Sequence, residues 1–270
     1  MKEDNEKKKI NSLRNNPYAA IGCSVIIILF AIILGVVSKR GQQVAATQQA
    51  EAATAQAARE AVAAKEQEAR KASVQRGSFT DARDKKAYKT VKIGDQTWMA
   101  ENLNYNASGS KCYGEGGEVR LPGGAPVKIT SKEMQANCVK YGRLYNWNTA
   151  IKACPKGWHL PSAEEWQILV DFVGGKEIAG KKLKTKSGWN ENGNGLDDYS
   201  FSALPGGQGS DGQFLFVSKR GQWWTASECG EDWGTEKAVC NRGIDYDSDD
   251  LKLYLGGSKR LFFSVRCLQD

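Results

Sequence analysis

The chain has 270 residues, of which 40% are hydrophobic, and a formal net charge of +7. The charge is uneven, because residues 1–76 carry twelve Lys or Arg against seven Asp or Glu, whereas residues 77–270 carry twenty-six against twenty-four. A nucleic-acid-binding domain needs a concentrated basic face. The nearly neutral composition of residues 77–270 therefore speaks against nucleic acid as a partner.

A membrane-spanning helix is predicted for residues 18–37. These twenty residues contain no charged side chain, and as a helix they would extend roughly 30 Å, the thickness of the hydrocarbon core of a bilayer. Five basic residues precede the segment, and only Lys39 and Arg40 follow it closely. The positive-inside rule keeps residues 1–17 in the cytoplasm as a basic tail and exports the rest. We predict a single-pass protein of a bacterial inner membrane with a periplasmic C-terminal domain.

A cleaved signal peptide is the alternative interpretation of the same segment. The apolar region of a signal peptide normally has roughly 7–15 residues, and Lys39 and Arg40 would crowd the cleavage site. The length of the segment therefore favours an anchor. Cys23 precedes most of the apolar run, which is the wrong order for a lipoprotein signal, so we expect no lipid attachment there.

Residues 38–76 are predicted to form a helical stalk. Residues 41–76 include thirteen Ala and seven Gln and lack Pro, and Ala is the strongest helix former. Their large apolar residues are Val44, Val62 and Val74, which are too few to specify the seam of a coiled coil. Two structures fit this composition: a solvated stalk, and a homo-oligomeric coiled coil packed through an alanine seam.

Six further cysteines, all after residue 110, predict a disulfide-bonded domain over residues 77–270. An even number without a Cys-x-x-C pair is typical of a disulfide framework rather than of a zinc or redox site. Disulfides persist in oxidising compartments, which agrees with the exported orientation. Six cysteines allow fifteen pairings, and their spacing favours Cys112–Cys138, Cys154–Cys267 and Cys229–Cys240.

The domain is predicted to be α+β, with short strands, one or two helices and long loops. Alternating residues around a turn at Gly94 and Asp95 indicate a hairpin over 88–100. Residues 101–130 are rich in Gly and loop-like. A second short helix is expected at 176–184, and brief apolar runs after it indicate strands.

The clearest element is a helix predicted over residues 162–173. Pro161 disfavours the α conformation at Leu160, so the chain arrives extended. Ser162 is then the N-cap, and Glu165 completes a capping box. One apolar stripe follows at helical spacing, and it consists of Trp166, Leu169, Val170 and Val173.

Several motifs of the domain occur in an order that identifies a family. They are GSFTDARD (77–84), YKTVKIGDQTWMAENLNY (88–105), YGRLY (141–145), ACPKGWHLPS (153–162), DYSFSALPGG (198–207) and FSVRC (263–267). Residues 77–270 thus resemble the Fibrobacter succinogenes major paralogous domain. The resemblance implies a C-type-lectin-like, formylglycine-generating-enzyme-like fold in which the GWHLP segment opens a helix and the final RC strand returns beside it.

The resemblance bears on the disulfides and on catalysis. It supports Cys154–Cys267, whereas Cys229–Cys240 is not typical of the family pattern. The family implies no established biochemical activity. Formylglycine-generating enzymes use a dedicated reactive cysteine pair, and this chain has no matching motif, so we expect no oxidase activity.

His159 is the only histidine in the chain. A multi-histidine metal site is therefore excluded, and a Ser-His-Asp or Cys-His mechanism would have to use this one residue. Its place between Trp158 and Leu160 favours a packed structural role. We expect the protein not to be an enzyme, and an enzyme using carboxylates alone is the least favoured hypothesis because nothing marks a paired acid and base.

Calcium is the one cofactor that the sequence offers. Residues 190–198 place oxygen ligands at alternate positions, but no Glu stands at the twelfth position of a calcium loop. A polar turn built on left-handed Asn and Gly residues is the commoner explanation. The candidate calcium ligands are Asn192, Asn194, Asp197 and Asp198.

Two further segments could bind a ligand. Trp223 and Trp224 are neighbours in a predicted strand, so they point to opposite faces. One would enter the core, and the other could face outward and hold a sugar ring. The alternative is that both are packed. Residues 245–250 form an acidic cluster that is either a solvated loop or a ligand site, and its candidate residues are Asp245, Asp247 and Asp249.

These features predict a membrane-anchored, non-catalytic binding module in the periplasm. Its partner would be a protein of an envelope assembly or a glycan, because varied loops on a fixed core suit recognition. The alternative is a structural subunit of an oligomeric membrane complex, assembled through the transmembrane helix and the stalk.

Overall fold

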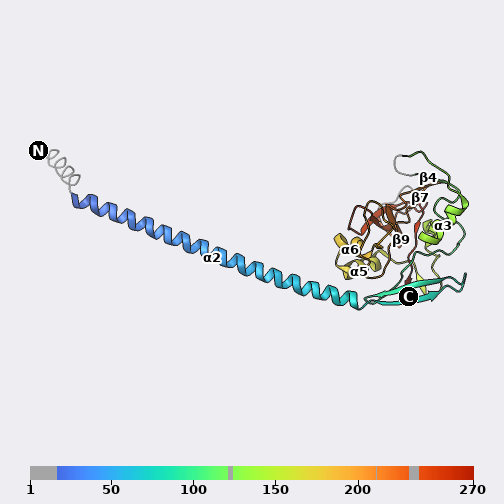
Figure 1. Ribbon diagram of the computed structural model, residues 1–270, viewed down its shortest axis with the longest axis horizontal. Coiled ribbons are helices and arrows are strands. Elements are labelled where there is room, and N and C mark those ends of the chain that lie inside the picture. The colour runs from blue at the N-terminus through green and yellow to red at the C-terminus, as the bar shows by residue number, and fades with distance from the viewer. Residues whose placement is uncertain (1–16, 121–123, 211, 231–236) are drawn as a thin grey trace. The chain divides into compact units, whose positions relative to one another are not determined.

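The structure is a computed structural model that describes residues 17–120, 124–210, 212–230 and 237–270, with side chains from residue 28 onward. It divides into two compact units, Met1–Ala64 and Lys65–Asp270, shown in Figure 1. The predicted basic tail lies outside the described residues, apart from Pro17. The elements of the second unit form an α+β architecture, as the sequence predicts.

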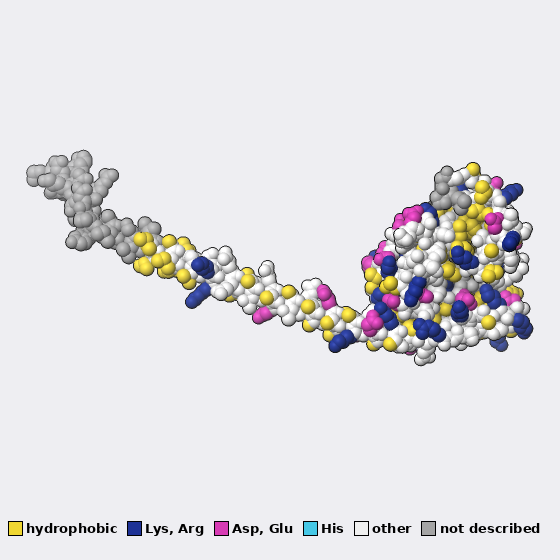
Figure 2. Space-filling model, in the orientation of Figure 1, with side chains coloured by type: hydrophobic (Ala, Val, Ile, Leu, Met, Phe, Trp, Pro, Cys, Tyr) yellow, Lys and Arg dark blue, Asp and Glu magenta, His cyan; other side chains and the backbone are white. Residues whose placement is uncertain are grey.

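One continuous helix, α2 (Pro17–Ala72), covers the predicted membrane span and the predicted stalk up to Ala72, whereas residues 75 and 76 belong to the first strand. Apolar side chains from Ile28 to Val37 are exposed, and Figure 2 shows hydrophobic atoms on the surface of this part of the helix. Among the described residues, only Ile28–Ala72 is long and apolar enough to cross a membrane, with a mean hydropathy of 1.3 in its 18-residue window. Homo-oligomers and a coiled coil stay predictions.

The last two turns of α2 are part of the second unit. Arg70 donates a hydrogen bond to the carbonyl of Phe172 (2.9 Å) and lies over its ring. Lys71 forms an ion pair with Asp198 (3.0 Å), and Gln67 donates to the hydroxyl of Tyr199. These contacts join the helix end to the domain before the first strand begins.

The strands of the second unit form three small sheets. The first contains β1 (Gln75–Thr80), β2 (Ala87–Ile93), β3 (Gln96–Met99), β13 (Leu268–Gln269) and β6 (Trp158–His159), in that order. The second contains β11 (Lys252–Gly257), β10 (Val239–Asp245), β9 (Arg220–Glu228), β12 (Phe263–Ser264) and β5 (Leu144–Tyr145). The third contains β4 (Glu118–Arg120), β8 (Gln213–Leu215) and β7 (Gln208–Ser210). The predicted hairpin is confirmed as β2 and β3, which pair around Gly94 at φ +61°.

The helix predicted over 162–173 is confirmed as α5 (Ala163–Val173). Both arms of the capping box between Ser162 and Glu165 are present, and the helix ends at Gly174 with a left-handed φ of 112°. Its predicted apolar stripe is fully buried. A second short helix, α6 (Lys176–Leu183), follows as expected.

Two helices go beyond those predicted by sequence. α3 (Ser131–Tyr141) begins with a complete capping box between Thr130 and Glu133. The other is the short α4 (Trp147–Ala150), which follows β5 and has Asn146 as its N-cap. The local signals for these elements are polar caps rather than apolar stripes.

Aromatic rings fill the core between α5 and the sheets. The ring centroid of Trp166 lies 4.8 Å from that of Trp98, 5.8 Å from that of Phe201 and 6.1 Å from that of Trp223. All four side chains are at most 1% exposed. The tryptophans therefore act as large core residues in a unit with short elements and long loops.

The three preferred disulfides are all formed. Their Cα–Cα distances are 5.0 Å for Cys112–Cys138, 5.9 Å for Cys154–Cys267 and 5.6 Å for Cys229–Cys240. The second spans 113 residues and joins the segment before α5 to the C-terminal strand. Three disulfides indicate that the second unit folds in an oxidising compartment.

Candidate functional site

The tryptophan pair does not form an exposed sugar platform. Trp223 and Trp224 do point to opposite faces of β9, but both are 0% exposed. Trp223 donates to Asn102 Oδ1 (2.8 Å) on one face, and Trp224 donates to the carbonyl of Tyr145 (2.6 Å) on the other. The prediction of an outward-facing ring is wrong because β9 lies inside its sheet between β10 and β12, and a hydrophobic cluster covers each face.

The two loops predicted as ligand or metal sites meet around a lysine. Lys184, 1% exposed, donates from Nζ to the carbonyls of Gly193 (3.0 Å), Asp245 (3.0 Å) and Tyr246 (3.3 Å). Burial lowers the pKa of this ammonium group. One charge from the end of α6 thus joins residues 190–198 to the acidic loop that follows β10.

Three of the four candidate calcium ligands have protein partners. Asn194 Oδ1 accepts a hydrogen bond from the amide of Trp189 (3.0 Å), and Asp197 accepts from the amide and hydroxyl of Ser202 (2.8 and 2.9 Å). Asp198 pairs with a lysine of α2, and Asn192 has a left-handed φ of 62°. Among the described residues, no three His, Cys, Asp or Glu side chains gather closely enough for a metal ion. This donor set does not fit the six to eight oxygens that calcium requires.

The three candidate residues of the acidic cluster are one paired and two exposed carboxylates. Asp245 accepts from Arg220 Nε (2.5 Å) and lies 3.7 Å from Lys252 Nζ. The side chains of Asp247 and Asp249 are exposed at the surface. Asp245 therefore belongs to an ion-pair network at the end of β10, whereas the other two are available to a ligand.

His159 is held between two carboxylates. Its Nδ1 lies 2.7 Å from Asp270 Oδ1, and its Nε2 lies 3.0 Å from Glu165 Oε1. Burial lowers the pKa of His159, but hydrogen bonds and charges from Asp270 and Glu165 outweigh it, so the pKa is raised above 6.5. The ring thus connects β6, the start of α5 and the C-terminal residue.

Four of the family-like motifs meet around a buried arginine. Arg266, 0% exposed, donates to Asn102 Oδ1 (2.8 Å) and to the carbonyls of Met99 (3.1 Å) and Phe201 (2.6 Å). Asn102 in turn donates to the carbonyl of Tyr141 (2.9 Å). Burial lowers the pKa of Arg266, and the neutral acceptors around it compensate for the loss of water. This cluster stabilises the interior rather than facing a ligand.

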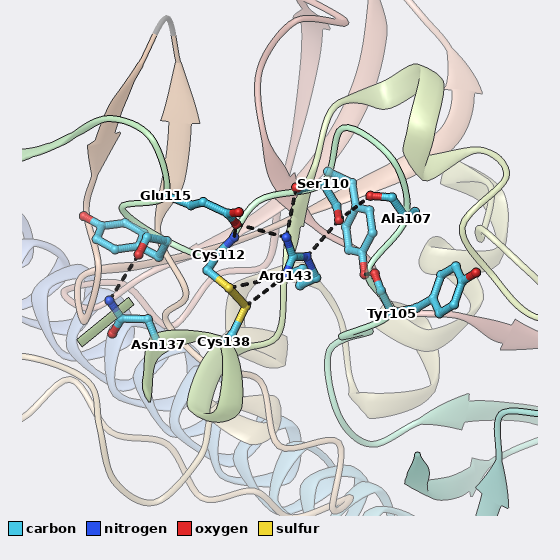
Figure 3. Close-up of a disulfide and its surroundings, with 10 residues drawn as sticks. Tyr105, Ala107, Ser110, Cys112, Glu115, Asn137, Cys138 and Arg143 are labelled. Carbon is cyan, nitrogen blue, oxygen red and sulfur yellow. Dashed lines mark hydrogen bonds and ion pairs between the residues drawn. A yellow bond between two sulfur atoms is a disulfide. The ribbon is translucent and has the colours of Figure 1, made fainter. Parts of the chain in front are cut away.

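A second arginine fixes the loop around the first disulfide (Figure 3). Arg143 Nη2 donates to Glu115 Oε2 (2.9 Å) and to the carbonyl of Ser110 (3.1 Å), and Nη1 contacts both sulfur atoms of the Cys112–Cys138 disulfide. Glu115 also accepts from the amide of Cys112 (2.7 Å). These contacts therefore hold residues 110–115 against Arg143 and α3.

A hollow of about 380 Å³ lies between α5, α6 and the β10–β11 edge of the second sheet. Arg242 of β10 lines it and is only 2% exposed, although no sequence motif marks this residue. Its Nη2 donates to the carbonyl of Ala163 (3.2 Å) and to Gln167 Oε1 (3.0 Å). The sequence of β10, which also contains Asn241 and Asp245, does not single out this arginine, and only the fold brings it against α5.

The comparisons with known proteins agree with the motif order. The family model of the Fibrobacter succinogenes major domain matches residues 91–269, which start within β2 and end within β13. The comparisons with curated proteins and with solved structures found no match. Helix α2 and strand β1 lie outside the matched residues. Since the match covers well over half of the sequence, the chain belongs to the Fibrobacter succinogenes major domain family.

Proposed function

We propose that this protein is a membrane-anchored, non-catalytic binding module whose Lys65–Asp270 unit lies in the periplasm. The observation that carries the proposal is a unit with three disulfides directly after a helix that is long and apolar enough to span a membrane. The residues would then be a cytoplasmic tail (1–17), a transmembrane helix (18–37), a stalk (38–76) and the binding domain (77–270).

The proposal includes a C-type-lectin-like arrangement of the domain. β13 at the C-terminus pairs with both β3 and β6, so the two ends of the domain share one sheet. α5 opens directly after the GWHLP segment, and Cys154–Cys267 ties that segment to the last strand. This framework leaves long loops between its short elements, and such loops suit recognition.

A non-catalytic role is supported by the contacts of the side chains that could otherwise react. The single histidine contacts two carboxylates, and the six cysteines after residue 110 are paired in disulfides. The occupant that we propose is a protein partner in an envelope assembly or a glycan. Either partner would contact the long loops of the Lys65–Asp270 unit and the exposed surface of its sheets.

The location can be tested on the full chain in native membranes. Protein isolated in the presence of an alkylating reagent should keep the six cysteines after residue 110 unmodified until a reductant is added. Protease added to spheroplasts should remove the Lys65–Asp270 unit. Free thiols among these six cysteines, or a domain that is protected in spheroplasts, would contradict the proposal.

The binding role needs a separate measurement. Photo-crosslinking groups can be placed at Val139 and Leu255, which are 71% and 65% exposed, with Lys156 as a polar control position. We expect crosslinks to an envelope protein from at least one apolar position and none from the control. A glycan array with the solubilised chain covers the other occupant, and failure of both assays would remove the binding role.

A further inference from the structure

The hollow beside Arg242 has the composition of an anion site. Three cationic side chains and one carboxylate line it, together with one amide and two leucines. They are Arg242, Lys176, Lys252, Asp250, Gln167 and the pair Leu251 and Leu253. The excess of positive charge sits in a depression rather than on a convex surface, so it would act on a small ligand from several sides.

Arg242 carries a buried charge without an ionic partner. No carboxylate oxygen lies within 4.0 Å of its guanidinium group among the described residues, and its Nε is buried with no acceptor there. Burial lowers the pKa of Arg242, and the more distant charges of Asp171 and Glu164 oppose this only in part. An unpaired buried charge is costly, so an anion at this point would stabilise the folded unit.

The two lysines that line the hollow, Lys176 and Lys252, form only long ion pairs among the described residues. Lys176 lies 3.8 Å from the exposed Glu177, and Lys252 lies 3.7 Å from Asp245, which already pairs closely with Arg220. Leu253, 40% exposed, adds an apolar wall. A ligand here would therefore present an anionic group to the arginine and the lysines and an apolar face to the leucine.

We propose that this hollow binds the carboxylate of a small acidic ligand of the uronic acid class. The positive charges of Arg242 and the two lysines attract a carboxylate, and Asp250 can accept hydrogen bonds from sugar hydroxyls. The inference rests on the proposed binding role and names its ligand class.

The test uses the detergent-solubilised full chain and three probes at fixed ionic strength. Calorimetric titration should show binding of D-glucuronate and none of D-glucose, which has the same ring without the carboxylate. Succinate tests whether a carboxylate suffices without a sugar ring. Binding of succinate supports an anion site whether or not glucuronate also binds. Equal binding of glucose and glucuronate, or no binding of any probe, would overturn the inference.

Variants place the binding at this hollow. The double substitution Lys176→Gln and Lys252→Gln changes exposed side chains and should weaken glucuronate binding roughly tenfold. The matched control, Lys132→Gln with Lys156→Gln, removes the same charge from other exposed positions and should leave affinity within about twofold. Equal loss in both doubles would mean unspecific attraction and overturn the site.

The outcomes separate the two proposals. Arg242→Lys keeps the charge but loses the guanidinium hydrogen bonds to Ala163 and Gln167 that fix its position, so it should weaken binding if the variant folds. The surface doubles settle the question if it does not fold. Loss of glucuronate binding with intact disulfides and partner crosslinks would remove only the anion site. Free thiols among the six cysteines after residue 110 would instead remove the periplasmic module.

Discussion

At the scale of single residues, the unit depends on a few buried polar side chains that join distant segments. Asn102 accepts from both Arg266 and Trp223 and donates to the carbonyl of Tyr141. It therefore links the segment after β3, the C-terminal strand region, β9 and α3. Buried donors that lose such an acceptor cannot find water.

We expect Asn102→Ala to lower the free energy of unfolding by about 2–4 kcal/mol, because it leaves donors of Arg266 and Trp223 buried without an acceptor. Urea unfolding of the disulfide-intact protein measures the change. Asn106→Ala is the matched control, since Asn106 is exposed on the same loop. A loss no larger than that of the control would show that the cluster is not important for stability.

The clamp on His159 makes stability depend on pH. The folded-state pKa is raised above 6.5, so the contribution is complete below that pH and is lost as the pH rises through the folded-state pKa. The thermal midpoint of the wild type should therefore exceed that of His159→Gln at about pH 6, and the difference should shrink by about pH 9. No other histidine titrates in this chain, and a constant difference would contradict the clamp.

Residue environments were the hardest feature to predict from sequence. The alternation of Trp223 and Trp224 follows from strand geometry, but the cover over both faces comes from segments far away in the chain. Lys184 follows a short helix, and its sequence position predicts a solvated side chain. In the structure, loops around residues 193 and 245 surround it. Arg242 is similar, because α5 reaches it only in the folded unit.

At the scale of elements, local signals were sufficient where caps and stripes coincide. α5 has an N-cap, a capping box, an apolar stripe and a closing glycine within thirteen residues, and all of them are used. α3 has the same capping box, but only Cys138 and Tyr141 of its residues are buried. A search for apolar periodicity therefore misses α3, although Thr130 and Glu133 mark its start.

The capping box of α5 has a measurable effect. Ser162→Ala removes the acceptor for the amide of Glu165 and should lower the free energy of unfolding by about 1 kcal/mol. Ser108→Ala, at an exposed loop position, should change it by less than about 0.5 kcal/mol. Equal effects of the two substitutions in a urea titration would argue against the cap.

The end of α2 is predicted to be ordered by its contacts with the domain. Lys71→Gln removes the ion pair with Asp198, which should speed hydrogen exchange of the amides in the last turns of the helix. Lys65→Gln, which changes an exposed lysine of the same helix, is the control and should leave exchange unchanged. Identical exchange in both variants would mean that the ion pair does not fix the helix end.

At the scale of the whole molecule, disulfides compensate for short elements. Cys154–Cys267 closes 113 residues, Cys112–Cys138 closes 26 and Cys229–Cys240 closes 11. The even cysteine count and the spacing predicted all three from sequence. The chain entropy removed from the unfolded state grows with loop length, so the three should differ in their effect.

Replacing Cys154 and Cys267 with Ala should therefore lower the free energy of unfolding most, by about 4–5 kcal/mol. Replacing Cys229 and Cys240 should lower it by about 3 kcal/mol in the same chain-entropy picture. Thermal and urea unfolding of the double variants measure the order. A larger effect of the shorter loop would show that packing around the bonds outweighs chain entropy.

The ammonium group of Lys184 has a consequence for how this surface can change over generations. Its three acceptors come from two separate stretches of backbone, so neither stretch can be lengthened or redrawn on its own. An insertion that moves one of these carbonyls away leaves the buried charge of Lys184 with fewer acceptors. The other stretch of backbone is then destabilised as well, because it packs around the same charge. Diversity at this end of the molecule should then arise as paired changes, and engineers who graft new sequences there would need to redesign both together.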